Sequence, residues 1–391
     1  MKRWLLKAEE GERIDLVGEK NTMINIAFIA SKLQVGGAER QLQELINNIN
    51  KQKFNITVIC LYNLDKIGEE IKRSGIKCYS NILRSRFFLP SMRTLIKILR
   101  DEKINLCFIW NQPLTMFYGV IAAKCVHVDK IITAIHSTIS LERMLRKYFI
   151  NKLLIRFVDK IIAVGTNQRE YLIQREHFPP EKITVIFNGV DIDKYQGDVN
   201  KENKKRELGI SRNYKVVGLI GRLHACKRHD IFLRAARLVV QQYPNVIFSI
   251  VGDGEERRNI ETLIEKLDLG QHVRMLGFRR DIIEITKILD ISVLSSDTEA
   301  LPMTIIESMA SHVPVVATEV GSVPDLIMNG ENGILIPPHS PERLAEAILR
   351  ILNNEPLAHK MGENGYHIAY TKFSVESMVA NYERLFMGVD L

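Results

Sequence analysis

The strongest constraint on how this chain folds is an alternation of short apolar, β-branched runs with longer amphipathic stretches. Apolar runs separated by helical patterns are typical of parallel strands that helices cover on both faces of a sheet. Two such series follow one another in 391 residues, a length for which two domains are expected. The sequence therefore predicts an α/β protein with two Rossmann-like, doubly wound parallel-sheet domains. The predicted strands are 24–30, 56–61, 106–110, 131–135, 160–164 and 183–186 in the first series and 216–220, 246–251, 273–276, 291–294 and 315–317 in the second.

A polar, charge-rich stretch at 193–214 lacks a buried strand and separates the two series. We therefore predict an N-terminal domain at 23–195 and a C-terminal domain at 196–372. Residues 1–22 show no strand pattern and are predicted to form a tail or an arm. The amphipathic pattern within 373–391 predicts a terminal helix.

The composition excludes several classes of protein. A hydrophobic fraction of 46% and a charged fraction of 26% exclude disordered and collagen-like chains. No apolar run approaches the ~18 residues that a membrane span needs, and the basic start of the chain is followed by too few apolar residues for a signal peptide. The five cysteines are widely spaced and odd in number, which argues against a disulfide framework and indicates a reducing, cytoplasmic location.

The net charge of +8 is concentrated in one half of the chain. Lys and Arg outnumber Asp and Glu by 31 to 20 in residues 1–195, whereas they are outnumbered by 26 to 23 in residues 196–391. The basic half should attract an anionic partner. Charge alone leaves open a phosphoryl-bearing acceptor, a membrane surface or nucleic acid.

The clearest chemical pattern is SSDTEALPMTIIE, which directly follows the predicted strand at 291–294. Pro302 fits the first turn of a helix, where its missing N–H costs nothing. The main-chain N–H groups at Leu301, Met303 and Thr304 would then form an anion site at the carboxyl edge of the sheet.

Two carboxylates flank this turn. Glu299 precedes the predicted helix and Glu307 lies about one and a half turns inside it, so both are placed to accept hydrogen bonds from paired sugar hydroxyls. A structural interpretation stays open from the spacing alone, in which Glu299 caps the helix and Glu307 is solvated.

Two cations follow another strand of the second series. Arg222 comes directly after the strand that ends in Gly221, and Lys227 comes five residues later. An arginine and a lysine at a strand's carboxyl end can neutralise a diphosphate. An ordinary basic loop is the alternative.

In the first series, Gly36 and Gly37 follow the first strand and open the first predicted helix. Glycines there allow a ligand to approach the helix N-terminus closely, although a simple tight turn is the alternative. His136 ends a strand on the same expected edge, but a lone histidine is more often structural.

Several motifs are misleading or missing. The segment VGDGEER imitates a dinucleotide fingerprint, but Arg257 stands where its third glycine would be. The sequence contains no P-loop, zinc-ligand, carboxylate-cage or serine-hydrolase motif, so it predicts no metal site and none of those enzyme classes.

Together these motifs make the chain resemble the retaining glycosyltransferases of family 4. Glu299 and Glu307 form the E-x7-E pattern of that family, and GGAER, VIFNGVD, GRL…K, VGDG and LGF occur in its order over about residues 24–390. The resemblance implies a GT-B fold, in which two Rossmann-like domains face a cleft that binds a nucleotide-sugar. It also implies that the last helix crosses back to the N-terminal domain.

The resemblance assigns roles residue by residue. Arg222 and Lys227 match the pair that holds the donor diphosphate, and Glu307 matches the carboxylate that binds the ribose. Glu299 and His136 match residues near the donor sugar. The catalytic set implied is thus Arg222, Lys227, Glu299 and His136, and the remaining donor-binding positions are Gly36, Gly37, Gly252, Gly277, Phe278, Leu301, Met303, Thr304 and Glu307. Asn188, in N-G-V-D, is given a structural role at the domain junction.

Three departures from the family pattern leave the base and sugar preference open. Ala300 replaces the glycine that usually follows the first glutamate, and Ser311-His312 replaces the usual Cys-Gly or Ala-Gly. The basic pair Arg279-Arg280 follows LGF. None of these changes removes a charged group that the chemistry needs.

The resemblance implies a retaining, metal-independent hexosyltransferase without a cofactor, because the nucleotide-sugar is its donor substrate. We expect a hexosyl or N-acetylhexosaminyl unit to move from a UDP-sugar to a lipid-linked or cell-envelope saccharide. The open alternatives are a GDP-mannose-type mannosyltransferase, a nucleotide-sugar epimerase or hydrolase, and a catalytically silent sensor or nucleic-acid binder. The presence of Arg222, Lys227, Glu299 and Glu307 argues against a catalytically silent protein. No RNA-binding aromatic motif occurs, so no nucleic-acid partner is expected.

The basic N-terminal half also predicts where an acceptor docks. Segments 84–88 and 143–149 mix cations with aromatic residues. We expect them to contact an anionic surface at the inner face of the plasma membrane, with solvated helix faces as the alternative.

Overall fold

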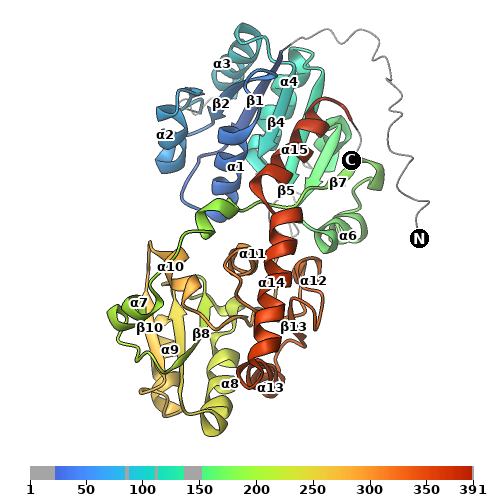
Figure 1. The fold of residues 1–391 in the computed structure, drawn as a ribbon. Coiled ribbons are helices and arrows are strands. Elements are labelled where there is room, and N and C mark those ends of the chain that lie inside the picture. Colours follow the sequence, from blue (N-terminus) through green and yellow to red (C-terminus); the bar gives the residue numbers. More distant parts are fainter. Residues whose placement is uncertain (1–22, 84–87, 111–112, 136–151, 390–391) are drawn as a thin grey trace, which may run out of the picture.

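The computed structural model describes residues 23–83, 88–110, 113–135 and 152–389. Within these ranges the chain forms two parallel sheets, each with helices on both faces, and the two lie one above the other in Figure 1. The predicted α/β architecture of two doubly wound domains is therefore confirmed.

The first sheet has seven parallel strands in the order β3-β2-β1-β4-β5-β6-β7. Its order reverses between β1 and β4, and in doubly wound sheets ligands bind at the carboxyl ends of the strands at such a point. One strand, β3, was not expected from the sequence. The strands are β1 (Ile24–Ala30), β2 (Phe54–Cys60), β3 (Lys77–Tyr79), β4 (Leu106–Trp110), β5 (Lys130–Ile135), β6 (Lys160–Ala163) and β7 (Ile183–Val185).

Two apolar cores sandwich this sheet because its strands are buried on both faces. One face packs against α1 (Gly37–Asn48) and α2 (Asp65–Arg73). The other packs against α3 (Phe88–Asp101), α4 (Pro113–Cys125) and α6 (Thr166–Gln174).

The second sheet has six parallel strands in the order β10-β9-β8-β11-β12-β13, with a reversal between β8 and β11. The last strand, β13, was not expected from the sequence. The strands are β8 (Lys215–Ile220), β9 (Val246–Val251), β10 (Val273–Gly277), β11 (Ile291–Leu294), β12 (Val315–Thr318) and β13 (Gly333–Ile336).

The helices of the second domain divide between its two faces. Four of them contribute to one core cluster, namely α8 (His229–Gln242), α9 (Arg257–Lys266), α13 (Pro341–Leu352) and, through Met361, α14 (Glu355–Lys372). The others are α7 (Lys201–Glu207), α10 (Ile282–Lys287), α11 (Met303–Ala310) and α12 (Val323–Leu326). The polar stretch at 193–214 contains α7 and no strand, as its composition indicates.

The end of the chain returns to the first domain. In Figure 1, α14 leads from the second domain towards the first, and α15 (Val375–Phe386) lies against the first sheet. The Phe386 ring packs against Phe28, Phe54 and Phe108, with centroids 5.7–6.3 Å away. A Cβ at Gly189 would lie 2.6 Å from the Ser374 carbonyl oxygen, so the glycine of N-G-V-D allows this crossing.

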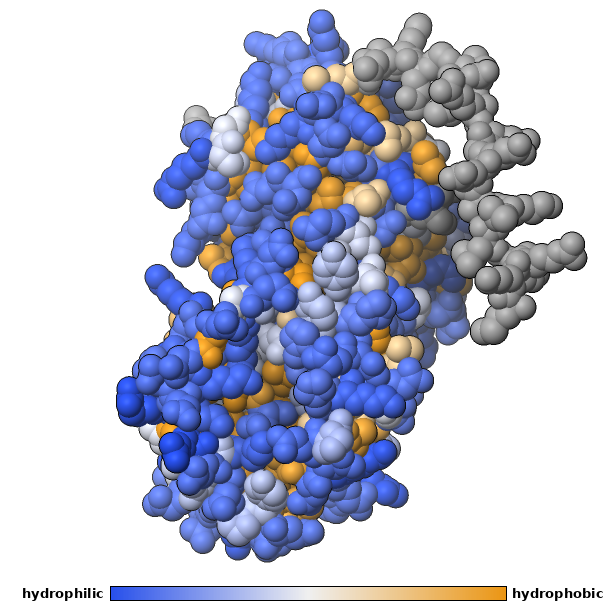
Figure 2. Space-filling model, in the orientation of Figure 1, coloured by the Kyte–Doolittle hydropathy of each residue, from blue (hydrophilic) through white to orange (hydrophobic). Residues whose placement is uncertain are grey.

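The outer surface is mixed. In the face shown in Figure 2, hydrophilic residues dominate and hydrophobic ones form patches between them. Among the described residues, none of the helices combines the length and apolarity that crossing a membrane requires.

Candidate functional site

The carboxyl edge of the second sheet is built from loops that pack main chain against main chain. The Gly221 N–H donates to the Val251 carbonyl at 2.9 Å, and the Leu223 N–H donates to the Asp253 carbonyl at 3.0 Å. Gly252 has a φ of +137°, and a Cβ there would lie 1.9 Å from the Gly221 carbonyl oxygen. A glycine at position 252 is therefore required for the loops to meet. This structural role is separate from the predicted contact of Gly252 with the donor.

Lys227 and Glu299 meet at this edge although 72 residues separate them. The Lys227 Nζ lies 2.5 Å from Oε1 of Glu299, and the Ser296 hydroxyl donates to the same oxygen at 2.6 Å. Only 22% of the lysine side chain and 11% of the glutamate side chain are exposed. Because the pair is shielded from water, its charges act more strongly than those of a surface pair.

Arg222 lies in the same loop but contacts a different carboxylate. Its guanidinium is 3.1 Å from Glu255, and 71% of its side chain is exposed. Exposed ion pairs contribute little to stability, so an incoming diphosphate can compete for Arg222 at little cost. The structure thus places Arg222 and Lys227 in one loop, each with its own carboxylate partner.

The N-terminus of α11 presents main-chain donors at the same edge. Pro302, its N-cap residue, has an extended backbone, and no side chain caps the helix. Within the described chain, the N–H groups of Met303 and Thr304 make no hydrogen bond to a main-chain carbonyl. Leu301 is buried and anchors the preceding turn. Free N–H groups and the helix dipole favour an anion here, as the sequence predicts.

Glu307 lies inside α11 and interacts with the first domain. Burial raises the pKa of its carboxyl above the ordinary value, and the charge of Arg40 on α1 lowers that pKa by less. No described residue donates a hydrogen bond to this carboxylate. Burial also raises the pKa of the neighbouring Tyr195 phenol, and the charge of Glu307 adds to that effect. Glu307 is therefore a partly buried acceptor that no described side chain or main-chain N–H uses.

The opposing wall comes from the loop after β1. A Cβ at Gly37 would meet nothing within 4 Å, whereas one at Gly36 would lie 2.3 Å from Oε2 of Glu39. Burial raises the pKa of Glu39, while a hydrogen bond from its own main-chain N–H lowers it by less. Gly37 thus leaves an open approach to the N-terminus of α1, where an anion would meet the Glu39 carboxylate as a competitor.

The structure does not bring every predicted residue together. Gly277 has a φ of +66°, and its carbonyl accepts the Gly252 N–H at 2.8 Å, so it supports the loops. Phe278, predicted to shape the base pocket, is 72% exposed. His136 lies outside the described residues, as do 84–87 and 143–149 of the predicted membrane segments.

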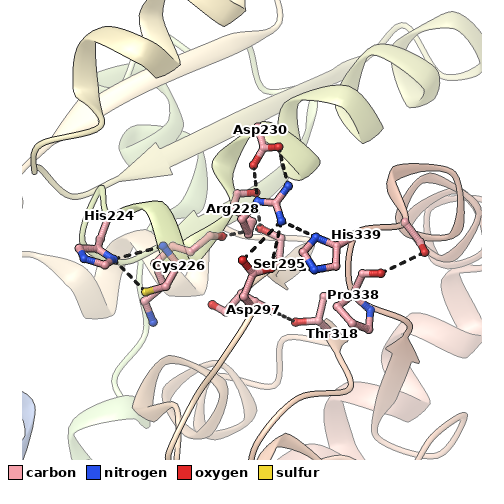
Figure 3. A network of polar contacts seen from close by, with 12 residues as sticks. His224, Cys226, Arg228, Asp230, Ser295, Asp297, Thr318, Pro338 and His339 are labelled. Atoms are coloured by element: carbon pink, nitrogen blue, oxygen red, sulfur yellow. Dashed lines mark hydrogen bonds and ion pairs between the residues drawn. The ribbon is translucent and has the colours of Figure 1, made fainter. Parts of the chain in front are cut away.

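The sequence interpretation missed Arg228, which directly follows Lys227. Arg228 adopts a left-handed backbone with a φ of +51°. Its guanidinium donates to Asp230 at 2.8 Å and to Asp297 at 3.1 Å, and it contacts His339 (Figure 3). These partners come from three separate segments, so only the acidic residue at 230 could have signalled this role.

Arg228 and Ser295 together fix the backbone around Lys227. The Ser295 hydroxyl lies 2.9 Å from the Lys227 carbonyl oxygen and 3.1 Å from that of Arg228 (Figure 3). A pocket of about 440 Å³ opens beside this network, lined by residues that include Cys226 and His229. The network explains how a flexible lysine is held towards Glu299.

Metal-ligating residues do not gather in the described part of the chain. There, no group of three or more His, Cys, Asp or Glu side chains has the arrangement of a metal site. The charged groups that do meet at this edge are Lys227, in the loop after β8, and Glu299, which precedes α11.

Two family models match the chain. The family model described as "Glycosyltransferase Family 4" matches residues 35–194, and the model described as "Glycosyl transferases group 1" matches residues 200–368. Between them, the two models match most of the chain.

Two curated relatives illustrate the similarity. The UDP-Gal:alpha-D-GlcNAc-diphosphoundecaprenol alpha-1,3-galactosyltransferase of Escherichia coli is 25% identical over 94% of this chain and 98% of its own length. The N-acetyl-alpha-D-glucosaminyl L-malate synthase of Bacillus anthracis is 29% identical over 71% of this chain and 74% of its own length.

Solved structures share the architecture. Anabaena HepE in complex with UDP has a TM-score of 0.83 at 22% identity, covering 94% of this chain and all of its own. A glycosyltransferase from Rickettsia africae has a TM-score of 0.84 at 21% identity, covering 94% of this chain and 98% of its own. The two facing α/β domains form the GT-B fold.

Proposed function

Since the chain belongs to the family 4 type of GT-B glycosyltransferases, we propose that it transfers a hexosyl or N-acetylhexosaminyl unit from a UDP-sugar to a lipid-linked or cell-envelope saccharide. One observation carries the proposal: the Lys227–Glu299 pair lies at the same strand edge as the unpaired N-terminus of α11. This edge offers an anion site and a sugar-hydroxyl acceptor side by side.

The leaving diphosphate is stabilised by fixed positive groups. Lys227 is held by its backbone network, Arg222 is released from its exposed pair with Glu255, and Met303 and Thr304 supply N–H donors. Donors aimed at developing negative charge lower the barrier without reorganising during the reaction. These groups supply the stabilisation that a metal ion gives in other enzymes, so we propose metal-independent transfer.

Glu307 binds the ribose of the donor. Its carboxylate has no hydrogen-bond donor among the described residues and is partly buried. A pair of neighbouring hydroxyls would satisfy both oxygens, which offsets the cost of burying the charge.

Retention follows from attack on the face from which the diphosphate leaves. Glu299 already accepts from Lys227 and Ser296, which favours a role in orienting the sugar over one as a nucleophile. The acceptor oxygen bonds to the anomeric carbon as the carbon–oxygen bond to the diphosphate breaks. The acceptor proton passes to the departing phosphate oxygen.

The relatives support the choice of donor and acceptor. The Escherichia coli relative is named for a UDP-Gal donor and a diphosphoundecaprenol-linked acceptor, and HepE has structures with UDP and with UDP-glucose. A GDP-mannose-type mannosyltransferase is the second candidate, because Ala300 and Arg279-Arg280 depart from the family pattern near the sugar and the base. We further propose that the basic N-terminal half meets an anionic membrane surface carrying the acceptor.

A transfer assay in EDTA tests this function. A panel of UDP- and GDP-sugars is incubated with an undecaprenyl-diphosphate-linked saccharide, and the anomeric configuration of the product is read by NMR. We expect one donor to give an α-linked product, as retention of the α-configured donor requires. An inverted anomer or strict dependence on added divalent cation would refute the mechanism, and turnover without acceptor would favour the hydrolase or epimerase.

A further inference from the structure

Helix α6 of the first domain is capped by a residue of the second domain. Its own N-cap position is Gly165, which has no side chain to accept a hydrogen bond. Asp325 of α12 takes this role: its Oδ2 accepts the Thr166 N–H at 2.7 Å, and its Oδ1 accepts from the Thr166 hydroxyl. The two residues lie 159 positions apart. Because an N-cap bond stabilises the helix that it caps, this contact favours the observed placement of the two domains.

A second contact lies beside the first. The Asn167 side chain donates to the Gly321 carbonyl at 2.9 Å, again across the domain boundary. The approach is close, because a Cβ at Gly165 would lie 2.1 Å from the Ser322 hydroxyl oxygen. The Ser322 hydroxyl is itself buried without a hydrogen-bond partner among the described residues. The close contact between the domains therefore requires a residue without a side chain at position 165.

These contacts lead directly to the proposed sugar site. Gly321 has a φ of +50°, and a Cβ there would lie 1.7 Å from the Glu299 carbonyl oxygen. The main chains of Gly321 and Glu299 are thus in direct contact, and a shift of one displaces the other. Glu299 in turn holds Lys227 at 2.5 Å. A continuous path of contacts runs from α6 of the first domain to the ion pair of the second.

We propose that Thr166, Asn167 and Asp325 form an interdomain latch that positions the Glu299 loop for transfer, with Asp325 as a positioning residue. This inference rests on the proposed function. The first domain is where the acceptor docks, and Glu299 orients the donor sugar. These contacts form only when the two domains have the observed placement. They therefore align the two substrates and close the site around them in that placement.

Hydrogen exchange tests the latch without knowledge of the donor. In Asp325→Ala, main-chain amides within 296–306 should exchange about fivefold faster than in the wild type, because an N-cap is worth about 1 kcal/mol and 1.4 kcal/mol corresponds to a factor of ten. The matched control is Asn354→Ala, which removes the cap of α14, where the Asn354 side chain accepts the Leu357 N–H at 3.0 Å. Unchanged exchange in Asp325→Ala, or an equal change in the control, would overturn the latch.

Kinetics separate positioning from mere stability. In Asp325→Ala and Asn167→Ala, kcat should fall about tenfold to a hundredfold and donor hydrolysis should rise relative to transfer, while calorimetric binding of UDP alone stays within about twofold of wild type. Asp325→Asn, which keeps an acceptor oxygen, should recover part of kcat. Equal losses in UDP affinity and kcat would refute a positioning role. If the wild type binds neither UDP nor GDP, the proposed function fails while the exchange experiment still decides the latch.

Discussion

At the scale of residues, the cations predicted to hold the diphosphate are each paired with a carboxylate before any ligand arrives. Lys227 and Glu299 are neutralised by each other, and Arg222 by an exposed glutamate. Glu307 is different, since its carboxylate is partly buried and accepts no hydrogen bond from a described residue. Burying a carboxylate without hydrogen-bond donors costs stability. A ligand that supplies the donors offsets this cost when it binds.

Glu307→Gln should stabilise the ligand-free protein. The raised pKa of Glu307 means that the folded state prefers the protonated form, so the ionised carboxylate lowers stability at neutral pH. The gain in Tm should be largest near pH 7 and vanish as the pH falls below 4.5, the ordinary value, where the wild-type carboxyl is protonated in both states. Thermal unfolding at several pH values measures this. A variant less stable than the wild type at pH 7 would contradict the account.

The same substitution should weaken nucleotide binding. Hydrogen bonds to a charged group are worth about 1.5–3 kcal/mol, so the loss of the carboxylate should raise the Kd for UDP about tenfold to a hundredfold. Calorimetry at pH 7.5 gives both constants. Equal affinity in the two proteins would remove Glu307 from the donor site.

Lys227→Ala should reduce kcat about a hundredfold or more, as expected when one stabiliser of a developing anion is removed. Initial rates at saturating donor measure the effect. The matched control is Arg343→Ala, which breaks an exposed pair with Glu346 on α13 and should leave kcat unchanged. A loss in Lys227→Ala no larger than in the control would exclude Lys227 from the chemistry.

At the scale of elements, the sequence predicts most of the strands because they are continuous apolar runs between helical patterns. The missed strand β3 is an edge strand of the first sheet and has only three residues, so its sequence shows little apolar pattern. Helix α14 escapes prediction because Gly362 and Gly365 interrupt it, and glycine normally disfavours a helix interior. The structure explains Gly362: a Cβ there would lie 2.2 Å from the His312 carbonyl oxygen, so close packing of α14 requires it.

Phe386→Ala should destabilise the first domain although the residue lies near the end of the chain. The ring is 3% exposed among aromatic residues of the first sheet, and truncating such a side chain costs about 3–5 kcal/mol. Urea unfolding followed by far-UV circular dichroism measures the loss. Tyr370→Ala on α14, 57% exposed, is the control and should stay near wild type. Comparable stability of the two variants would mean that α15 contributes little to this core.

At the scale of the whole molecule, the sequence predicts two domains and the order of their motifs, but not the contacts between the domains. Glu299, Glu307 and Lys227 belong to recognisable local patterns, and the fold brings Glu299 and Lys227 together at one strand edge. Thr166 and Asp325 have no such pattern, since their contact joins helices 159 positions apart. Pairing across domains depends on the packing of both, which no local periodicity encodes.

The central claim is that the carboxyl edge of the second sheet binds a nucleoside diphosphate without a metal ion. Calorimetric titration of the full chain in EDTA with UDP, GDP, ADP and NAD tests it most directly. The account predicts saturable binding of UDP, or of GDP if the second candidate holds, with the affinity reduced at least about tenfold in Arg222→Ala. Binding of none of these nucleotides, or binding that Arg222→Ala and Glu307→Gln leave unchanged, would contradict it.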